Sequence, residues 1–332
     1  MADLHALAKQ LLAKPKGLLA ADESSTSIEK KLNSIGLDSS HESRTAYRNM
    51  LLNTKGIEQY LSGIILYDET FRDTAPTGQP FLAMLRSKGI LPGIKVDKGT
   101  KDLAGSPGEK VTTDLSGLQE RFAEYRDMGA AFSKWRSVIT IGKDIPTKNC
   151  IELNAVALAR YAVLSQAAGI VPIVEPEVLM TGDHSQDLCE KITGDVLDQV
   201  FLQLNNHGVD LRGMILKPNM VISGQDAARL STPAEVAKAT IRCFVSHVPK
   251  EVPGIVFLSG GQTPEEATLN LNAINQQAQS LPWELSFSYG RALQDEALKL
   301  WAGKSANRKI ARQAFLERAA KVSRARMGQY AA

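Results

Sequence analysis

The sequence predicts an α/β fold: a single (β/α)8 TIM barrel of eight parallel strands, with extra helices at its N- and C-terminal ends. Short apolar runs that end in polar or Gly/Pro residues recur eight times, and helix-length stretches separate them. Such connections suit parallel pairing, and near-continuous apolar runs fit strands buried on both faces. The 332 residues allow one barrel of roughly 250 residues plus extensions. An open doubly wound sheet uses the same alternation and remains the alternative.

The predicted strands are spread along the whole chain. In order they are residues 17–22, 62–68, 93–97, 132–138, 169–175, 213–217, 254–259 and 283–288. The stretch 151–168 is typical of the connections, because its apolar residues recur at near-helical spacing. Residues 73–80 and 99–108 are rich in Pro, Gly and Asp, but they are short enough to be barrel loops. No low-complexity linker divides the chain, so we expect one catalytic domain over residues 1–332.

The C-terminal end is strongly basic. Residues 304–326 hold eight Lys and Arg against one acidic residue, Glu317, and their apolar residues have near-helical spacing. We expect a basic helix at about 304–327. A solvated amphipathic helix that caps the barrel is favoured over a patch for an acidic partner or nucleic acid, because no nucleic-acid motif accompanies it.

Composition and sequence patterns limit the partners and the location to be expected for this protein. Hydrophobic content of 43% with 23% charged residues is ordinary globular composition, and a net charge of +3 gives no general attraction to nucleic acid or membrane. The three cysteines are far apart and form no disulfide framework or Cys-x-x-Cys site. No secretory pattern opens the chain, and no uncharged apolar run approaches the ~18 residues of a membrane span. We therefore expect a cytoplasmic protein without membrane partners.

Ionisable residues stand at the C-terminal ends of five predicted strands. They are Asp22 on the first, Lys95 on the third, Lys134 and Arg136 on the fourth, Glu175 and Glu177 on the fifth, and Lys217 on the sixth. Residues two apart on a strand share a face, and barrel enzymes place their active sites at this end. Structural ion pairs between neighbouring strands are the alternative for the two pairs. With a lysine on the next strand, a catalytic cluster is favoured.

Lys217 follows an apolar run and precedes Pro218. Desolvation disfavours an ammonium group at such a place, and a neighbouring cation such as Lys134 would disfavour it further. A neutral lysine attacks carbonyl carbons and forms a Schiff base. The alternative, a surface lysine that begins a loop, loses weight because Lys217 belongs to a cluster.

The last two strands indicate a phosphate site. They end in small residues and one cation, namely Ser259, Gly260, Gly261, Ser288, Gly290 and Arg291. Small residues let backbone N–H groups approach an anion, and Arg291 adds a charge-assisted contact. The loops after strands seven and eight are the usual phosphate site of this fold. Ser24, Ser27 and Lys95, on the other side of the mouth, are candidates for a second phosphate.

Metal and nucleotide chemistry have little support. The five histidines are scattered without ligand spacing to another His or Cys, and neither Gly-x-Gly-x-x-Gly nor a Walker-type loop occurs. We expect no metal and no organic cofactor.

Seven segments in this order resemble class I fructose-bisphosphate aldolase, the Schiff-base type that needs no metal. They are residues 19–24 (LAADES), 93–99 (GIKVDKG), 134–136 (KWR), 171–177 (VPIVEPE), 216–220 (LKPNM), 257–262 (FLSGGQ) and 287–291 (FSYGR). The resemblance spans nearly the whole chain. It implies a (β/α)8 barrel that reversibly cleaves fructose 1,6-bisphosphate to dihydroxyacetone phosphate and glyceraldehyde 3-phosphate in glycolysis and gluconeogenesis.

The resemblance also implies roles for the residues at the strand ends. Lys217 would be the Schiff-base nucleophile, Glu175 the proton shuttle, and Asp22 the group that acts on the hydroxyl beyond the breaking bond. Lys134 would hold the carbinolamine hydroxyl, and Glu177 with Arg136 would keep the network ordered. The 1-phosphate would bind Ser259, Gly260 and Arg291, and the 6-phosphate Ser24, Ser27 and Lys95. The family further implies a homo-oligomer, usually a tetramer.

Two departures from the family pattern stand out. Lys31 occupies a position near the 6-phosphate where the family commonly has arginine, and lysine binds phosphate only as a point charge. The chain also ends at Tyr330-Ala331-Ala332, without the long tail whose terminal tyrosine assists proton transfer in many animal members. Two alternatives remain: another Schiff-base sugar-phosphate aldolase or transaldolase, and a non-catalytic scaffold or binding protein on the same fold.

Overall fold

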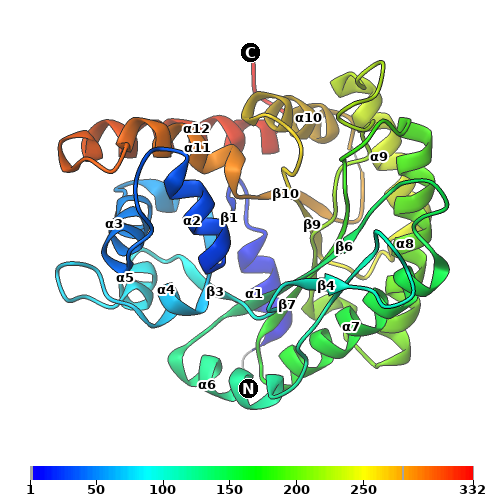
Figure 1. Ribbon diagram of the computed structural model, residues 1–332, viewed down its shortest axis with the longest axis horizontal. Coiled ribbons are helices and arrows are strands. Elements are labelled where there is room, and N and C mark those ends of the chain that lie inside the picture. Colours follow the sequence, from blue (N-terminus) through cyan, green and yellow to red (C-terminus); the bar gives the residue numbers. More distant parts are fainter. Residues whose placement is uncertain (1–2, 279, 332) are drawn as a thin grey trace.

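The computed structural model describes residues 3–278 and 280–331, and its centre is a closed barrel of parallel strands (Figure 1). Around the barrel the strands follow in the order β1 (Gly17–Ala21), β10 (Glu284–Tyr289), β9 (Gly254–Phe257), β8 (Ile215–Leu216), β7 (Val171–Val178), β6 (Phe132–Ile139), β3 (Leu91–Lys95) and β2 (Leu61–Leu66). All eight predicted strands are present. Closure confirms the barrel over the open sheet, because β1 pairs with both β2 and β10.

Helices surround the strands in Figure 1. They are α1 (Leu4–Leu11), α2 (Ser25–Asn33), α3 (His41–Leu52), α4 (Asp68–Arg72), α5 (Phe81–Ser87), α6 (Leu118–Met128), α7 (Lys148–Ala167), α8 (Gln186–Asn206), α9 (Pro233–His247), α10 (Pro264–Gln277), α11 (Arg291–Trp301) and α12 (Arg308–Arg326). Three short 3-10 turns are η1 (Ile57–Gln59), η2 (Leu211–Gly213) and η3 (Ser305–Asn307). The local sequence accounts for the N-terminal ends of two helices, α9 and α10. Thr232 and Thr263 each precede a proline and form a capping box with a glutamate three residues on.

One excursion differs from the sequence prediction. Within residues 99–112, where we expected a loop over 99–108, the chain forms an antiparallel pair of β4 (Thr100–Asp102) and β5 (Lys110–Thr112). These three-residue strands carry no apolar run, so no pattern in the sequence predicts them. Glu109 anchors the pair, because its buried carboxylate accepts hydrogen bonds from the backbone N and Oγ1 of Thr147, at 2.6 and 2.7 Å.

The barrel lumen has an apolar layer, and α1 closes the lumen at the N-terminal ends of the strands. The layer consists of Leu18, Ala20, Ile65, Phe132, Val171, Ile173, Ile215 and Val256, together with Ala8, Leu11 and Leu12 of α1. Phe132 fills the space left by a glycine, since a Cβ added to Gly93 would lie 2.3 Å from its ring. This packing fills the lumen towards the N-terminal ends of the strands, so a cavity can lie at their C-terminal ends.

The basic C-terminal helix begins later than expected, with η3 at Ser305–Asn307 and α12 from Arg308. It is also less solvated than expected. Arg318 and Arg326 are buried, and Arg326 donates to the carbonyl oxygens of Ala13 and Leu12 below the barrel. Burial lowers the pKa of Arg326 to about 10, although Glu284 opposes the shift. In the described part of the chain, no helix is both long and apolar enough to cross a membrane.

Candidate active site

A polar layer lies directly above the apolar layer of the lumen. Strand side chains alternate faces, so a residue two positions beyond a lumen residue also faces the lumen. Ala20, Phe132, Ile173 and Ile215 belong to the apolar layer, and two residues further along the chain stand Asp22, Lys134, Glu175 and Lys217. All four line one cavity of about 1140 Å³ at this end of the barrel. The alternation thus gathers side chains from four strands.

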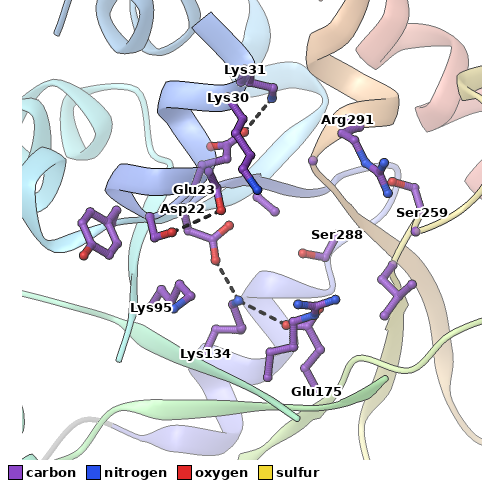
Figure 2. A pocket seen from close by; sticks show the side chains of 18 of the residues that line it. Asp22, Glu23, Lys30, Lys31, Lys95, Lys134, Glu175, Ser259, Ser288 and Arg291 are labelled. Carbon is purple, nitrogen blue, oxygen red and sulfur yellow. Dashed lines mark hydrogen bonds and ion pairs between the residues drawn. The ribbon is translucent and has the colours of Figure 1, made fainter. Parts of the chain in front are cut away.

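The four side chains form a connected ionic cluster, in which Figure 2 shows Lys134 between Asp22 and Glu175. The Nζ of Lys134 lies 2.8 Å from Asp22 Oδ2 and 3.3 Å from Glu175 Oε2, and the Nζ of Lys217 lies 3.2 Å from Glu175 Oε1. Lys134, Glu175 and Lys217 are only 4%, 3% and 3% exposed. Glu175 therefore lies between two amines, so the repulsion of Lys217 by Lys134 expected from the sequence is offset by a shared carboxylate.

Mutual attraction fixes the charges of this cluster. Burial by itself would raise the pKa of Asp22, but the ammonium groups of Lys134 and Lys217 outweigh it and the pKa is lowered well below its usual range. Burial would likewise lower the pKa of Lys134, but Asp22 and Glu175 raise it above the ordinary value. Asp22 is consequently a carboxylate, and Lys134 an ammonium, throughout the neutral pH range.

Arg136 and Glu177 form the next pair towards solvent. The Nε of Arg136 donates to Glu177 Oε2 across β6 and β7. Burial would lower the pKa of Arg136, but Glu177 outweighs it and raises the pKa. Gly260 packs against this pair, since an added Cβ would lie 2.9 Å from Glu177 Oε1. The structural alternative considered above is thus partly right: cross-strand ion pairs exist, and they lie in the cavity wall.

The β9–β10 side of the cavity presents hydrogen-bond donors. Ser259, Gly260, Ser288, Gly290 and Arg291 line it. The hydroxyl of Ser288 is buried without a hydrogen-bond partner, and Arg291, at the start of α11, forms no ion pair with another described residue. Gly261 does not line this cavity. Its φ of 75° turns the loop, and its carbonyl accepts from Gln225. Unpaired donors next to a helix N-terminus suit an anion.

The opposite side of the cavity, near β1 and β3, holds the second predicted phosphate site. Ser24, Ser27 and Lys95 line it. Ser24 donates to Ser27 at 3.1 Å, and Lys95 donates to the carboxylate and carbonyl of Asp97 at 2.5 and 2.7 Å. Asp97 also accepts from the backbone N of Gly99 and Arg136, so it ties three segments of the wall together.

Lys31, predicted to contact phosphate, lies in the wall with its ammonium already paired. It donates to Glu23 Oε1 at 2.6 Å and Gln294 Oε1 at 3.1 Å, while Arg48 lies 2.8 Å from the other Glu23 oxygen. Burial would raise the pKa of Glu23, but Lys31 and Arg48 lower it to about 2. Lys30, the residue before Lys31, is exposed and lines the cavity (Figure 2). Lys31 lines the cavity as well, so both lysines of this pair lie at the predicted site, and only the pairing of Lys31 with Glu23 depended on the fold.

Several cavity residues were not singled out as site residues from the sequence. They are Glu23, Lys30, Tyr67, Asp97, Lys98 and Thr100. Strand alternation could have found Tyr67, which stands two positions beyond the lumen residue Ile65 within the predicted strand 62–68. Lys98 and Thr100 reach the cavity through the β4–β5 excursion, which carried no signal.

The C-terminal Tyr330 lies away from the cavity. Its hydroxyl donates to Glu265 at 2.8 Å, and its backbone N donates to Asn272 at 2.9 Å, both on α10. Within residues 3–278 and 280–331, no group of three or more His, Cys, Asp or Glu side chains could hold a metal ion. The cavity itself is lined by amines and carboxylates.

Known proteins resemble this chain over nearly its whole length. Residues 3–332 match the family model described as fructose-bisphosphate aldolase class-I. A probable fructose-bisphosphate aldolase class 1 from Xanthomonas campestris pv. campestris is 49% identical over 324 residues, covering 97% of each chain. The cytosolic fructose-bisphosphate aldolase 4 of Arabidopsis thaliana is 49% identical over 315 residues, covering 95% of this chain and 80% of its own.

A solved structure is similar throughout. Fructose-bisphosphate aldolase from Plasmodium falciparum, in complex with TRAP and a small-molecule inhibitor, superposes with a TM-score of 0.97 at 44% identity. The match covers 99% of this chain and 95% of the other. Identity at this level extends the likeness from the fold to the sequence.

Proposed function

The chain belongs to the class I fructose-bisphosphate aldolase family and is a lyase that cleaves fructose 1,6-bisphosphate, and we propose that Lys217 is its Schiff-base nucleophile. The observation that carries this assignment is the position of its amine. The Nζ of Lys217 is buried in the cavity, 3.2 Å from a carboxylate oxygen of Glu175. Glu175 can take the ammonium proton and leave a neutral amine directed at the bound ketone.

Imine formation follows from this arrangement. The neutral Nζ of Lys217 attacks the ketone carbon, and the ketone oxygen becomes the hydroxyl of a carbinolamine. Glu175 returns its proton to that hydroxyl, which leaves as water, and the iminium ion remains. Lys134, which contacts Glu175 and Asp22, can hold the hydroxyl until it leaves. Each of these groups is within reach of the next, so proton transfer needs no large movement.

Cleavage uses the opposite side of the cluster. The iminium draws in the electron pair of the breaking carbon–carbon bond and becomes an enamine. The hydroxyl on the far carbon loses its proton to Asp22 as the aldehyde forms. The ammonium of Lys134 keeps Asp22 ionised, since it holds the pKa of that carboxyl low. Tyr330 is held on α10, so in this arrangement it does not reach the enamine.

We assign the two phosphates to the two sides of the cavity. Ser259, Gly260, Ser288, Gly290 and Arg291 bind the 1-phosphate, and the unpartnered hydroxyl of Ser288 supports this. Ser24, Ser27, Lys31 and Lys95 bind the 6-phosphate, and Lys30 lines the same side of the cavity.

Borohydride trapping tests the nucleophile. Reduction in the presence of dihydroxyacetone phosphate should attach the three-carbon unit to Lys217, as peptide mass mapping would show, and EDTA should leave activity unchanged. Replacing the surface residue Lys191 by alanine is the matched control and should leave labelling intact, because Lys191 only pairs with Asp195. Label on another lysine would contradict the assignment.

The assembly and location are also part of the proposal. The cytosolic relatives and the family resemblance support a cytoplasmic homotetramer. Light scattering at micromolar concentration should give about four times the chain mass of 36.0 kDa. A monomer mass would contradict the tetramer.

A further inference from the structure

Tyr67 occupies the polar layer of the lumen at the end of β2. In the pairing of β1 with β2, Ala21 lies opposite Leu66, and in that of β2 with β3, Leu66 lies opposite Ile94. The next residue on each strand is Asp22, Tyr67 and Lys95 respectively. Paired residues of parallel strands point to the same side. Tyr67 is therefore the neighbour of Asp22 on one side and of Lys95 on the other, and it lines the cavity.

Strand order places Tyr67 across the cavity from the nucleophile. Starting at β1, the barrel runs β2, β3, β6, β7, β8, β9 and β10 before it closes. In this ring β2 and β3 lie diametrically opposite β8 and β9, which carry Lys217 and Ser259. A substrate with a phosphate at each end, held at Lys217 and Ser259, extends its far phosphate towards Tyr67 and Lys95.

Two lysines on this side already donate to protein acceptors. Lys95 gives two of its three protons to Asp97, and Lys31 donates to Glu23 and Gln294. By contrast, the hydroxyl of half-buried Tyr67 donates to no other described residue. A donor held next to a partly neutralised lysine can make a charge-assisted hydrogen bond to a phosphate oxygen.

We propose that Tyr67 is a specificity-determining residue that donates its phenolic hydroxyl to the phosphate on the aldehyde side of the substrate. The inference rests on the proposed assignment of the 6-phosphate to the Ser24, Ser27 and Lys95 side. Tyr67 adds a donor on a side where Lys95 and Lys31 already donate to protein acceptors. It acts in binding and not in bond cleavage, because Lys217, Glu175 and Asp22 already account for the proton transfers of the reaction.

The Tyr67→Phe variant tests this with two substrates. Fructose 1,6-bisphosphate carries the far phosphate, and fructose 1-phosphate lacks it. We expect KM for fructose 1,6-bisphosphate to rise about tenfold with kcat within about twofold, as for loss of one hydrogen bond to a charged group. Both parameters for fructose 1-phosphate should stay unchanged. Tyr60→Phe is the matched control, because Tyr60 directly precedes β2 at the opposite end of the same strand.

Two results would overturn the proposal: an equal loss with both substrates, which places Tyr67 on a shared part of the substrate, and no loss with either. A separate measurement, trapping with dihydroxyacetone phosphate, tests the assignment of Lys217 as the nucleophile. Dihydroxyacetone phosphate lacks the far phosphate, so its trapping at Lys217 should be equal in wild type and Tyr67→Phe. Reduced trapping in the variant would also contradict the proposal, while absence of Lys217 label in wild type contradicts only the nucleophile.

Discussion

The cavity wall has two arcs, one formed by β6–β8 and one by β9–β10, and they differ in whether their polar side chains are paired within the protein. On the β6–β8 arc, Glu175 contacts both Lys134 and Lys217, and Lys134 also reaches Asp22. On the β9–β10 arc, the Ser288 hydroxyl is buried without a partner, and Arg291 forms no ion pair within the described residues. The first arc is complete without substrate, whereas the second is complete only when an anion binds.

The difference separates chemistry from binding. Buried charges must be paired, because desolvating an isolated ion costs several kcal/mol, and pairing also fixes their geometry. An arc of unpaired donors has no such internal support and gains its partners from the ligand. Substitutions in the first arc should therefore lower kcat, and those in the second should raise KM.

Lys217→Ala tests the first arc most severely. Cleavage should fall by roughly 10⁴-fold or more, because Lys134, the other amine of the cluster, stays an ammonium at neutral pH and cannot attack the ketone. The fold should survive, since Glu175 keeps its contact with Lys134. Steady-state kinetics and circular dichroism measure the two effects. Turnover near that of wild type would remove Lys217 from the mechanism.

Asp22→Asn should have the next largest effect. The amide cannot accept the hydroxyl proton, so kcat should fall roughly 10²- to 10³-fold with a smaller change in KM. Lys134 keeps one carboxylate partner, Glu175, and the cluster stays assembled. A change confined to KM would place Asp22 in binding and break the contrast between the arcs.

Arg291→Ala tests the second arc. We expect KM for fructose 1,6-bisphosphate to rise roughly 10- to 30-fold, because a charge-assisted contact to phosphate is lost. The value of kcat should change little. Arg291→Lys should recover part of the affinity, since lysine keeps the charge but not the bidentate geometry. A large fall in kcat with unchanged KM would contradict a role in phosphate binding.

Glu23 offers the smallest effect, measured in stability. Its pKa is lowered from 4.5 to about 2, so its carboxylate stabilises the fold above pH 4.5 and loses this contribution as the pH falls to about 2. Melting temperatures of wild type should decline in that window. Glu23→Gln should show less decline there and should be less stable at neutral pH, by the order of 2 kcal/mol, since Lys31 and Arg48 lose their counter-ion. A parallel pH profile for both proteins would contradict the ion-pair role.

Many residues of this site could be predicted from sequence, because their positions follow from the alternation of side chains along each strand. Period-two alternation assigns Lys134 with Arg136, and Glu175 with Glu177, to shared faces before any contact is known. Parallel strands bring their C-terminal ends together, so residues far apart in sequence were expected in one cavity. The bounds of the β4–β5 excursion were missed, because an anchor from Glu109 to Thr147 leaves no periodic pattern.

The sequence by itself determined the barrel class, the polar ends of its strands and the two groups of phosphate-binding candidates, since these follow from alternation and turn chemistry along each segment. Only the tertiary structure decided which charges meet. Asp22 reaches Lys134 across the lumen although β2 and β3 separate their strands, and Lys31 is paired with Glu23 in the wall of the same cavity. Ion pairing and donor availability depend on distances between segments far apart in the chain, and only closure of the barrel sets these distances.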